Sequence, residues 1–381
     1  MVQQKLTKSE FKKGAENIIL ELDKYKRNSY FTHNIHPYPA KFIPQIPREL
    51  ILRLSKKDDW VLDPFCGSGT TLVEAKLTCR NSIGVDVNPL SCLISKVKVT
   101  SLSLDNISEI KKVLFIIKRD ILRNVKFEQP EYPNIDLWFS EKAKNSLSVI
   151  RHYLNAIEYG SVKEFLSVAF SSIVVKASNQ ESDTSYRSIK KNLNEEQIWN
   201  MFAKKVNDML IRIRDFQSTA CPTISEIYNH DSRNLSFIQK KIDLIVTSPP
   251  YLNSYDYYLY HKHRMLWLSM DVSTTQEFEF GSRNKHNDKH ESLSDYLKSL
   301  KKVVSSASMK LKEGGYFSLV TGDGILRGEL IKMNREMDQL FDEIGYRKLR
   351  EIRFNQRKYT RSFTKNMKKI EKESYILVYR Y

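Results

Sequence analysis

The sequence has few cysteines, no zinc-binding pattern and no long hydrophobic segment. Its four cysteines, Cys66, Cys79, Cys92 and Cys221, include no CxxC pair, and no Cys/His cluster has the spacing of a zinc site. We therefore expect reduced thiols, an intracellular location and no bound metal. The longest apolar run, Phe165 to Val175, is interrupted by serines and too short to span a bilayer, so it predicts a buried helix. The N-terminus carries no apolar stretch, which argues against a signal peptide.

Acidic residues are scarce relative to basic ones. The 381 residues include 62 Lys and Arg against 45 Asp and Glu, which gives a formal net charge of +17. An excess of this size favours a polyanionic partner such as nucleic acid. The basic residues are spread along the chain, with one dense stretch from Arg353 to Lys369, so a purely basic arm is not expected. Apolar residues make up 41% of the chain, which is enough to build a core.

Alternating strand and helix patterns predict a doubly wound α/β domain. A short apolar strand over residues 59–62 leads into a glycine-rich turn and a helix pattern, and a second strand follows over residues 81–87. Residues 100–220 are mostly helical in pattern, with a loop-like stretch at residues 178–188. Two strand patterns close the chain and predict an antiparallel strand on a mostly parallel sheet. Three regions are expected: an N-terminal segment with the cofactor-binding half (1–99), a helical insertion (100–222) and a catalytic half (223–381).

The glycine-rich turn has the sequence DPFCGSGTT and follows the first strand, where ligands bind in open α/β sheets. Gly67 and Gly69 permit a sharp turn and close approach to a ligand. A P-loop needs Lys after its last glycine, where Thr70 stands, and a dinucleotide fingerprint needs a third Gly or Ala, where Leu72 stands. Asp86 ends the next strand and can accept hydrogen bonds from ribose hydroxyls. The pattern therefore predicts a nucleoside ligand without a pyrophosphate, such as S-adenosylmethionine.

A second motif, TSPPY, follows the apolar strand DLIV. Consecutive prolines fix the backbone and leave their carbonyls as rigid acceptors. An aromatic amine is a poor nucleophile, so it needs acceptors for its N–H groups, such as the Ser248 hydroxyl and the Pro249 carbonyl. Tyr251 offers a face on which a base can stack. A Pro-Cys nucleophile for attack on pyrimidine C6 is absent, because Cys221 precedes its proline. The motif predicts methyl transfer to an exocyclic amine.

Together these segments resemble the DNA amino-methyltransferases of restriction-modification type, which make N4-methylcytosine or N6-methyladenine. The resemblance implies a Rossmann-like seven-stranded methyltransferase sheet, S-adenosylmethionine as cofactor, no metal, and double-stranded DNA with a flipped-out base as substrate. It implies catalytic roles for the residues that end the TSPPY motif, namely Ser248, Pro249, Pro250 and Tyr251. It implies cofactor contacts from the glycine turn, the strand ends and the segment HPYPAKFIPQIP, namely Asp63, Phe65, Gly67, Gly69, Thr71, Asp86, Asn88, Asp231 and Lys41.

Within the family, Ser before PPY is more typical of N4-cytosine enzymes, and Asp or Asn there is more typical of N6-adenine enzymes. We therefore expect a site-specific cytosine-N4 methyltransferase in the prokaryotic cytoplasm, with a cognate restriction endonuclease as a candidate partner. An N6-adenine enzyme and an RNA amino-methyltransferase remain as alternatives. A non-catalytic DNA-binding protein is disfavoured by the intact motifs.

Candidate DNA contacts lie in the insertion and near the C-terminus. The insertion is a candidate DNA-recognition region, with Arg187, Lys190 and Lys191 as phosphate contacts beside the stretch Arg353 to Lys369. In the tyrosine-rich segment after TSPPY, half of the tyrosines are expected in the core. The two histidines of that segment, His261 and His263, are expected at the surface or facing DNA.

Overall fold

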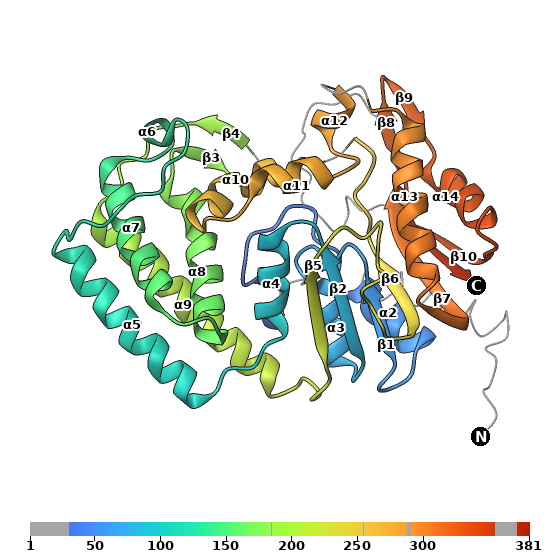
Figure 1. The fold of residues 1–381 in the computed structure, drawn as a ribbon, viewed down its shortest axis with the longest axis horizontal. Coiled ribbons are helices and arrows are strands. Elements are labelled where there is room, and N and C mark those ends of the chain that lie inside the picture. The colour runs from blue at the N-terminus through green and yellow to red at the C-terminus, as the bar shows by residue number, and fades with distance from the viewer. Residues whose placement is uncertain (1–29, 184, 254, 288–290, 355–371) are drawn as a thin grey trace.

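A computed structural model describes residues 30–183, 185–253, 255–287, 291–354 and 372–381. Its centre is a seven-stranded sheet in the order β10-β11-β7-β6-β1-β2-β5 (Figure 1). Neighbouring strands from β5 to β7 are parallel, and β11 is antiparallel to both β7 and β10. The predicted mostly parallel sheet with a terminal antiparallel strand is therefore confirmed. Its strands are β1 (Trp60–Asp63), β2 (Asn81–Asp86), β5 (Ser225–Asn229), β6 (Ile242–Thr247), β7 (Leu311–Gly322), β10 (Arg347–Phe354) and β11 (Ser374–Arg380).

Helices cover both faces of this sheet, because its central strands are apolar on both sides. On β1, Val61 packs toward one face and Leu62 toward the other, and each belongs to a different buried cluster. Parallel sheets need such coverage, since a crossover between parallel strands places a helix on a face. The helices are α2 (Gln45–Leu54), α3 (Thr70–Leu77), α4 (Pro89–Val99), α13 (Leu293–Ser308) and α14 (Met333–Asp342).

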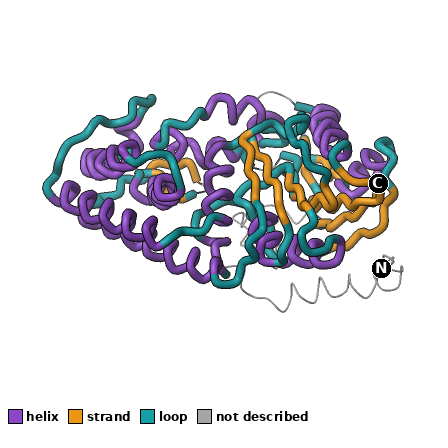
Figure 2. Tube along the Cα trace, turned by 60° about the horizontal axis from the view of Figure 1, so that its bottom comes forward, coloured by secondary structure: helices purple, strands orange, loops and turns teal. Residues whose placement is uncertain are grey.

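A helical lobe lies beside the sheet, next to α4 and β5 (Figures 1 and 2). The apolar run from Phe165 to Val175 lies within its central helix α8 and is buried throughout, as predicted. The core of the lobe also takes Ile94 from α4 and Trp267 from α10, so the lobe shares its core with the sheet part. The helices of the lobe are α5 (Leu104–Leu122), α6 (Ile135–Trp138), α7 (Glu141–Ala156), α8 (Ser161–Ala177) and α9 (Glu195–Gln217). Also described are η1 (Phe31–Asn34), α10 (Tyr257–Trp267), α11 (Val272–Phe278) and α12 (Arg283–Asn287), of which α12 lies on the sheet side near α13 (Figure 1).

Two short hairpins were not predicted. The stretch expected as a loop at residues 178–188 contains β3 (Gln180–Ser182) and β4 (Ser185–Ser188), which pair in antiparallel fashion. A second hairpin, β8 (Gly324–Leu326) with β9 (Glu329–Ile331), follows β7. The first hairpin is rich in polar residues, so its pairing depends on contacts with the rest of the chain more than on an apolar pattern. The strands of the second are only three residues long each, too short to show a strand pattern.

Cys79 and Cys221 form a disulfide, which differs from the expectation of reduced thiols. Their Cα atoms lie 5.1 Å apart although 142 residues separate them along the chain. The bond joins the end of α3 to the segment before β5. Cys66 and Cys92 are free and buried. Within the described ranges, no helix is long and apolar enough to cross a membrane.

Candidate active site

The glycine turn after β1 is as tight as the sequence predicts. Gly67 and Gly69 have φ angles of +48° and +77°, in the left-handed region that favours glycine. A Cβ atom at Gly69 would lie 2.9 Å from the Cα atom of Ser95 on α4. The Ser95 hydroxyl donates a hydrogen bond of 2.8 Å to the Gly67 carbonyl. The turn and α4 therefore pack together in a way that only glycine permits.

Asp86, at the end of β2, binds the same turn through its carboxylate. Its Oδ2 atom accepts a hydrogen bond of 2.9 Å from the Gly67 N–H, and its Oδ1 atom accepts one of 2.9 Å from the Asn88 N–H. Desolvation raises the pKa of Asp86 to about 6. Asn88 caps α4 by accepting from the Leu90 N–H, and its buried Nδ2 group has no hydrogen-bond partner among the described residues. A carboxylate and an unsatisfied amide donor thus lie together where the ribose is expected.

Asp63 connects the glycine turn to the TSPPY motif. Its Oδ1 atom accepts hydrogen bonds of 2.7 Å from the Thr247 hydroxyl and 3.1 Å from the Phe65 N–H. Burial raises the pKa of Asp63 to about 6. Thr71 is fully buried and lies behind the turn, where its hydroxyl faces the Val246 carbonyl at 3.5 Å. Asp63 and Thr71 therefore brace the two motifs against each other.

The other two predicted cofactor residues are held by side chains of their own neighbourhood. Asp231 follows β5, and its carboxylate forms an ion pair of 2.8 Å with Arg233. The Lys41 ammonium donates a hydrogen bond of 2.5 Å to Asn34 Oδ1. Burial, followed by the positive charge of Lys205, lowers the pKa of Lys41 to about 8. The structure thus places Lys41 beside η1 and α9.

Tyr38 is the residue of the HPYPAKFIPQIP segment that reaches the glycine turn. Its hydroxyl would lie 3.3 Å from a Cβ atom at Gly67 and is 2.9 Å from the Ser91 hydroxyl. The ring of Tyr38 lies 5.9 Å from the ring of Tyr257, measured between centroids. Sequence reasoning missed both tyrosines, although a tyrosine inside a proline-rich segment next to the predicted cofactor was an available signal.

Contacts with Tyr296 and with Gly322 hold the TSPPY loop that follows β6. The Tyr296 hydroxyl donates a hydrogen bond of 2.9 Å to the Pro250 carbonyl. The ring of Tyr251 lies against Gly322, where an added Cβ atom would approach it to 3.1 Å. Desolvation raises the pKa of Tyr251 to about 12, and a side-chain hydrogen bond with Ser248 acts in the opposite direction. The four candidate catalytic residues therefore form one ordered loop.

Carboxyl groups and aromatic faces gather between the two motifs. Glu279 is 6% exposed, and its carboxylate accepts hydrogen bonds from the Tyr257 and Tyr258 N–H groups at 2.8 and 3.4 Å. Burial, together with the charges of Asp256 and Asp86, raises the pKa of Glu279 to about 8 although the two N–H groups act in the opposite direction. The tyrosine faces and the ionised carboxylate of Asp86 suit a cationic ligand such as a sulfonium. The residues present therefore fit S-adenosylmethionine. Among the described residues, no group of three or more His, Cys, Asp or Glu side chains could hold a metal ion.

The expectation that the histidines of α10 face solvent or DNA was wrong. His261 is fully buried and His263 is 2% exposed, because α10 packs between the lobe and the sheet. The His263 ring stacks on Tyr186 of the β3–β4 hairpin, with centroids 5.3 Å apart. Arg264 is also buried and forms an ion pair with Asp183 of the same hairpin.

The predicted phosphate contacts divide into structural and exposed residues. Lys191 donates a hydrogen bond of 2.6 Å to the Gln180 carbonyl, so it holds the hairpin in place. Arg187 and Lys190 are exposed. Arg353 pairs with Glu351 at 2.8 Å, and most of the basic stretch that begins there lies outside the described residues.

The chain is similar in sequence to known methyltransferases. A family model for N6 and N4 methyltransferases, described as DNA methylase, matches residues 3–97. The type II methyltransferase M.MvaI of Kocuria varians is 30% identical over 267 residues, which cover 63% of this chain and 58% of that protein. M.MjaII of Methanocaldococcus jannaschii is 24% identical, covering 81% of this chain and 75% of the relative. M.BsoBI of Geobacillus stearothermophilus is 24% identical, covering 77% and 63%.

The chain therefore spans between 58% and 75% of the length of these three relatives. Among solved structures, TrmN from Thermus thermophilus is 10% identical over 89% of this chain and 49% of its own, with a TM-score of 0.35, too low to support an argument. The family's cofactor is S-adenosylmethionine, and the carboxylate, amide and aromatic groups around the glycine turn suit it. In its sequence matches, its sheet and its two adjoining motifs, the chain is similar to the DNA amino-methyltransferases.

Proposed function

We propose that this protein is a site-specific DNA methyltransferase that acts on the exocyclic N4 amine of cytosine. The observation that carries the proposal is the hydrogen bond of 2.7 Å between Thr247 and Asp63. It joins the Ser-Pro-Pro-Tyr loop to the glycine turn, so an amine held by one motif lies next to a cofactor held by the other. Proximity of this kind supplies a large part of the barrier reduction in group transfer.

The cofactor half of the site holds a nucleoside. The Asp86 carboxylate accepts hydrogen bonds from the ribose hydroxyls, and the Nδ2 group of Asn88 donates to an acceptor of the same ligand. Tyr38 and Tyr257 present aromatic faces close to the turn. Bound S-adenosylmethionine supplies an activated methyl group at this place.

The loop half of the site prepares the amine. The Ser248 hydroxyl and the Pro249 carbonyl accept the N–H groups of the amine and stabilise the positive charge that develops on nitrogen. The Pro250 carbonyl is already engaged by Tyr296, which keeps the backbone of the loop in one orientation. Tyr251 stacks on the flipped base. Ser248 at this position favours cytosine over adenine.

We propose duplex DNA as the substrate, as the family description and the type II relatives suggest. The helical lobe over residues 100–222 is the proposed recognition region. Its β3–β4 hairpin exposes Arg187 beside strand residues that contact α10, the helix that follows the catalytic loop. A restriction endonuclease of the same specificity is the proposed partner, in the prokaryotic cytoplasm.

The test is methylation of defined DNA by the purified protein with S-adenosylmethionine, read by nucleoside mass spectrometry and modification-sensitive sequencing. We expect N4-methylcytosine in one sequence context, lost in Ser248→Ala and retained in the matched control Ser236→Ala, whose side chain is exposed. N6-methyladenine would move the target to adenine. Methylation of RNA alone, or cofactor binding without transfer to any DNA, would contradict the proposal.

A further inference from the structure

The ring of Tyr251 rests on the backbone at the end of β7. A Cβ atom built at Gly322 would lie 3.1 Å from Tyr251 Cε2 on one side. The same atom would lie 3.3 Å from the Ser374 hydroxyl and 3.4 Å from the Glu373 carbonyl. Gly322 is therefore enclosed between the tyrosine and the start of β11. The position of the ring depends on where this backbone is held.

The residues after Tyr251 dock on the same stretch of backbone. A Cβ atom at Gly324 would lie 2.8 Å from Leu252, so the two residues are in tight contact. Asn253 Nδ2 donates a hydrogen bond of 2.8 Å to the Ile325 carbonyl. Residues 322–325, which we name the β7–β8 wall, therefore support three consecutive residues of the catalytic loop.

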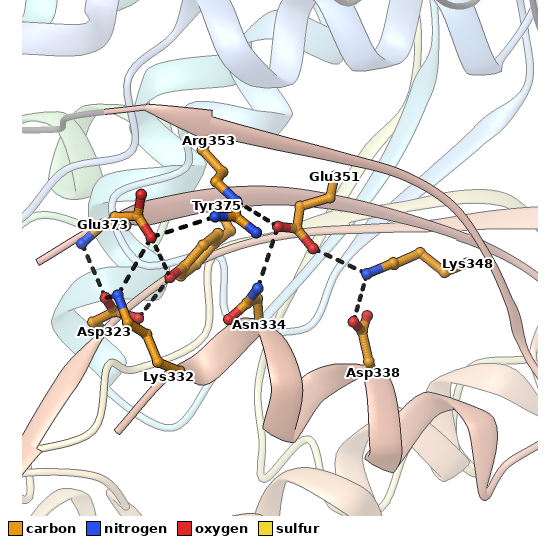
Figure 3. A network of polar contacts seen from close by, with 9 residues as sticks. All are labelled: Asp323, Lys332, Asn334, Asp338, Lys348, Glu351, Arg353, Glu373 and Tyr375. Carbon is orange, nitrogen blue, oxygen red and sulfur yellow. Dashed lines mark hydrogen bonds and ion pairs between the residues drawn. The ribbon is translucent and has the colours of Figure 1, made fainter. Parts of the chain in front are cut away.

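Asp323, between the two glycines of the wall, is anchored by a network of hydrogen bonds (Figure 3). It is 5% exposed. Its Oδ1 atom accepts from the Tyr375 hydroxyl at 2.9 Å, and its Oδ2 atom accepts from the Lys332 ammonium at 2.8 Å and the Glu373 N–H at 3.1 Å. Its own N–H donates to the Glu373 carbonyl at 2.9 Å. These four hydrogen bonds hold Asp323, and with it the backbone of the wall, against β11 and Lys332.

The two side chains that donate to Asp323, Lys332 and Tyr375, both hold their protons firmly. The hydrogen bond to Asp323 is the main reason that the pKa of Lys332 lies above its ordinary value. Burial, followed by the hydrogen bond to Asp323, raises the pKa of Tyr375. Both donors therefore keep their protons at physiological pH, and the carboxylate remains held on two sides. Hydrogen bonds to a charged acceptor are stronger than neutral ones, so losing one loosens the wall.

We propose that Asp323 and Tyr375 are positioning residues that hold the β7–β8 wall and thereby fix the ring of Tyr251 against which the target base stacks. This inference rests on the proposed function and deepens it, because it names residues outside both motifs that set the geometry of methyl transfer. Neither residue touches the base. Each acts through the backbone of Gly322, which is the contact between the network and the tyrosine ring.

The matched pair for the test is Tyr375→Phe and Tyr379→Phe. The two tyrosines lie four residues apart on β11, are 0% and 1% exposed, and each donates its hydroxyl to an aspartate. Tyr375 bonds Asp323 at 2.9 Å, whereas Tyr379 bonds Asp338 of α14 at 2.8 Å, at the far end of the network in Figure 3 from the wall. The substitutions remove the same atom from the same strand, so a purely structural role predicts similar effects for both.

Methyl transfer to the DNA substrate identified for the wild-type protein is the first measurement. We expect Tyr375→Phe to lower kcat roughly tenfold and to leave the Kd for S-adenosylmethionine within about twofold, because the tyrosine ring shifts while the cofactor half is untouched. Tyr379→Phe should keep kcat within about twofold of the wild-type value. Equal losses in both variants, or none in Tyr375→Phe and Asp323→Asn, would overturn the proposal.

A second measurement does not depend on activity. With 3-fluorotyrosine incorporated at position 251, the fluorine resonance should shift or broaden in Tyr375→Phe and stay unchanged in Tyr379→Phe. If the wild-type protein methylates no nucleic acid but the resonance responds in this way, the proposed function fails and the positioning role stands. If the resonance is the same in both variants, the positioning role fails, whatever the activity. Asp323→Asn provides the same readout should Tyr375→Phe not fold.

Discussion

Acidification should weaken cofactor binding through Asp86 without unfolding the protein. The Asp86 carboxylate is the acceptor proposed for the ribose hydroxyls, and only its ionised form offers both oxygens as acceptors. Its pKa is about 6 in the structure, because desolvation disfavours the charge more than the Gly67 and Asn88 N–H groups stabilise it. The residue therefore titrates just below neutral pH.

The expected size of the effect follows from that pKa. About nine in ten molecules carry the ionised carboxylate near pH 7, and about one in ten near pH 5. If only the ionised form binds, the apparent Kd rises roughly tenfold over this interval. Asp63 also has a pKa of about 6 and contributes to the raised pKa of Asp86, so part of the titration is shared between them.

Stability should change in the opposite direction. Because the pKa of folded Asp86 lies above the ordinary value of 3.8, the folded chain holds the proton more tightly than the unfolded chain does. The stability that this residue contributes is present at low pH and is lost as the pH rises through about 6. Through Asp86, the protein without cofactor gains stability between pH 7 and pH 5 while its affinity falls.

Isothermal titration of S-adenosylmethionine at pH values from about 5 to 7, with thermal unfolding of the free protein in the same buffers, measures both quantities. Asp86→Asn is the control. Its single acceptor oxygen cannot serve both N–H groups, so it should bind at least tenfold more weakly near neutral pH, with little pH dependence. An affinity for the wild-type protein that is flat over this range, or a tenfold slope that persists in Asp86→Asn, would refute the reasoning.

Three further outcomes are expected. Gly69→Ala should lower the free energy of unfolding by about 2 kcal/mol or more, measured by denaturant titration, because the added Cβ atom would lie 2.9 Å from the Ser95 Cα atom in a left-handed backbone. Tyr296→Phe should cost about 1 kcal/mol in stability and reduce kcat, since the Pro250 carbonyl loses its hydrogen bond of 2.9 Å; unchanged kinetics would remove Tyr296 from the loop's support. Ser248→Ala should lower kcat about 100-fold while calorimetry shows the cofactor Kd within about twofold, and loss of cofactor binding would mean that the loop has another role.

Much of the architecture could be predicted from local sequence patterns. The apolar strand before DPFCGSGTT and the strand before TSPPY are β1 and β6, which pair side by side in the sheet. The tight turn could also be predicted from the sequence, because Gly67 and Gly69 adopt the positive φ angles that glycine favours. Such features depend on neighbours a few residues away, and a linear sequence displays them directly.

Contacts between segments far apart in the sequence could not be predicted in this way. The pattern around His261 and His263 alternates polar and basic residues, so it resembled a surface. Both side chains are buried because α10 is enclosed by the lobe and the sheet. The β3–β4 hairpin was missed for the same reason, since its anchor, Arg264, lies 81 positions away from its partner Asp183.

The sequence by itself determined the sheet, the glycine turn, the position of Asp86 at the end of β2 and the Ser-Pro-Pro-Tyr loop, because each is encoded by local backbone chemistry. The tertiary structure alone decided which side chains surround them. It brought Tyr38 over the glycine turn, placed Glu279 at the start of α10, and set the β7–β8 wall beneath Tyr251. These assignments depend on which distant elements pack together, and packing is a property of the whole chain that no single segment reveals.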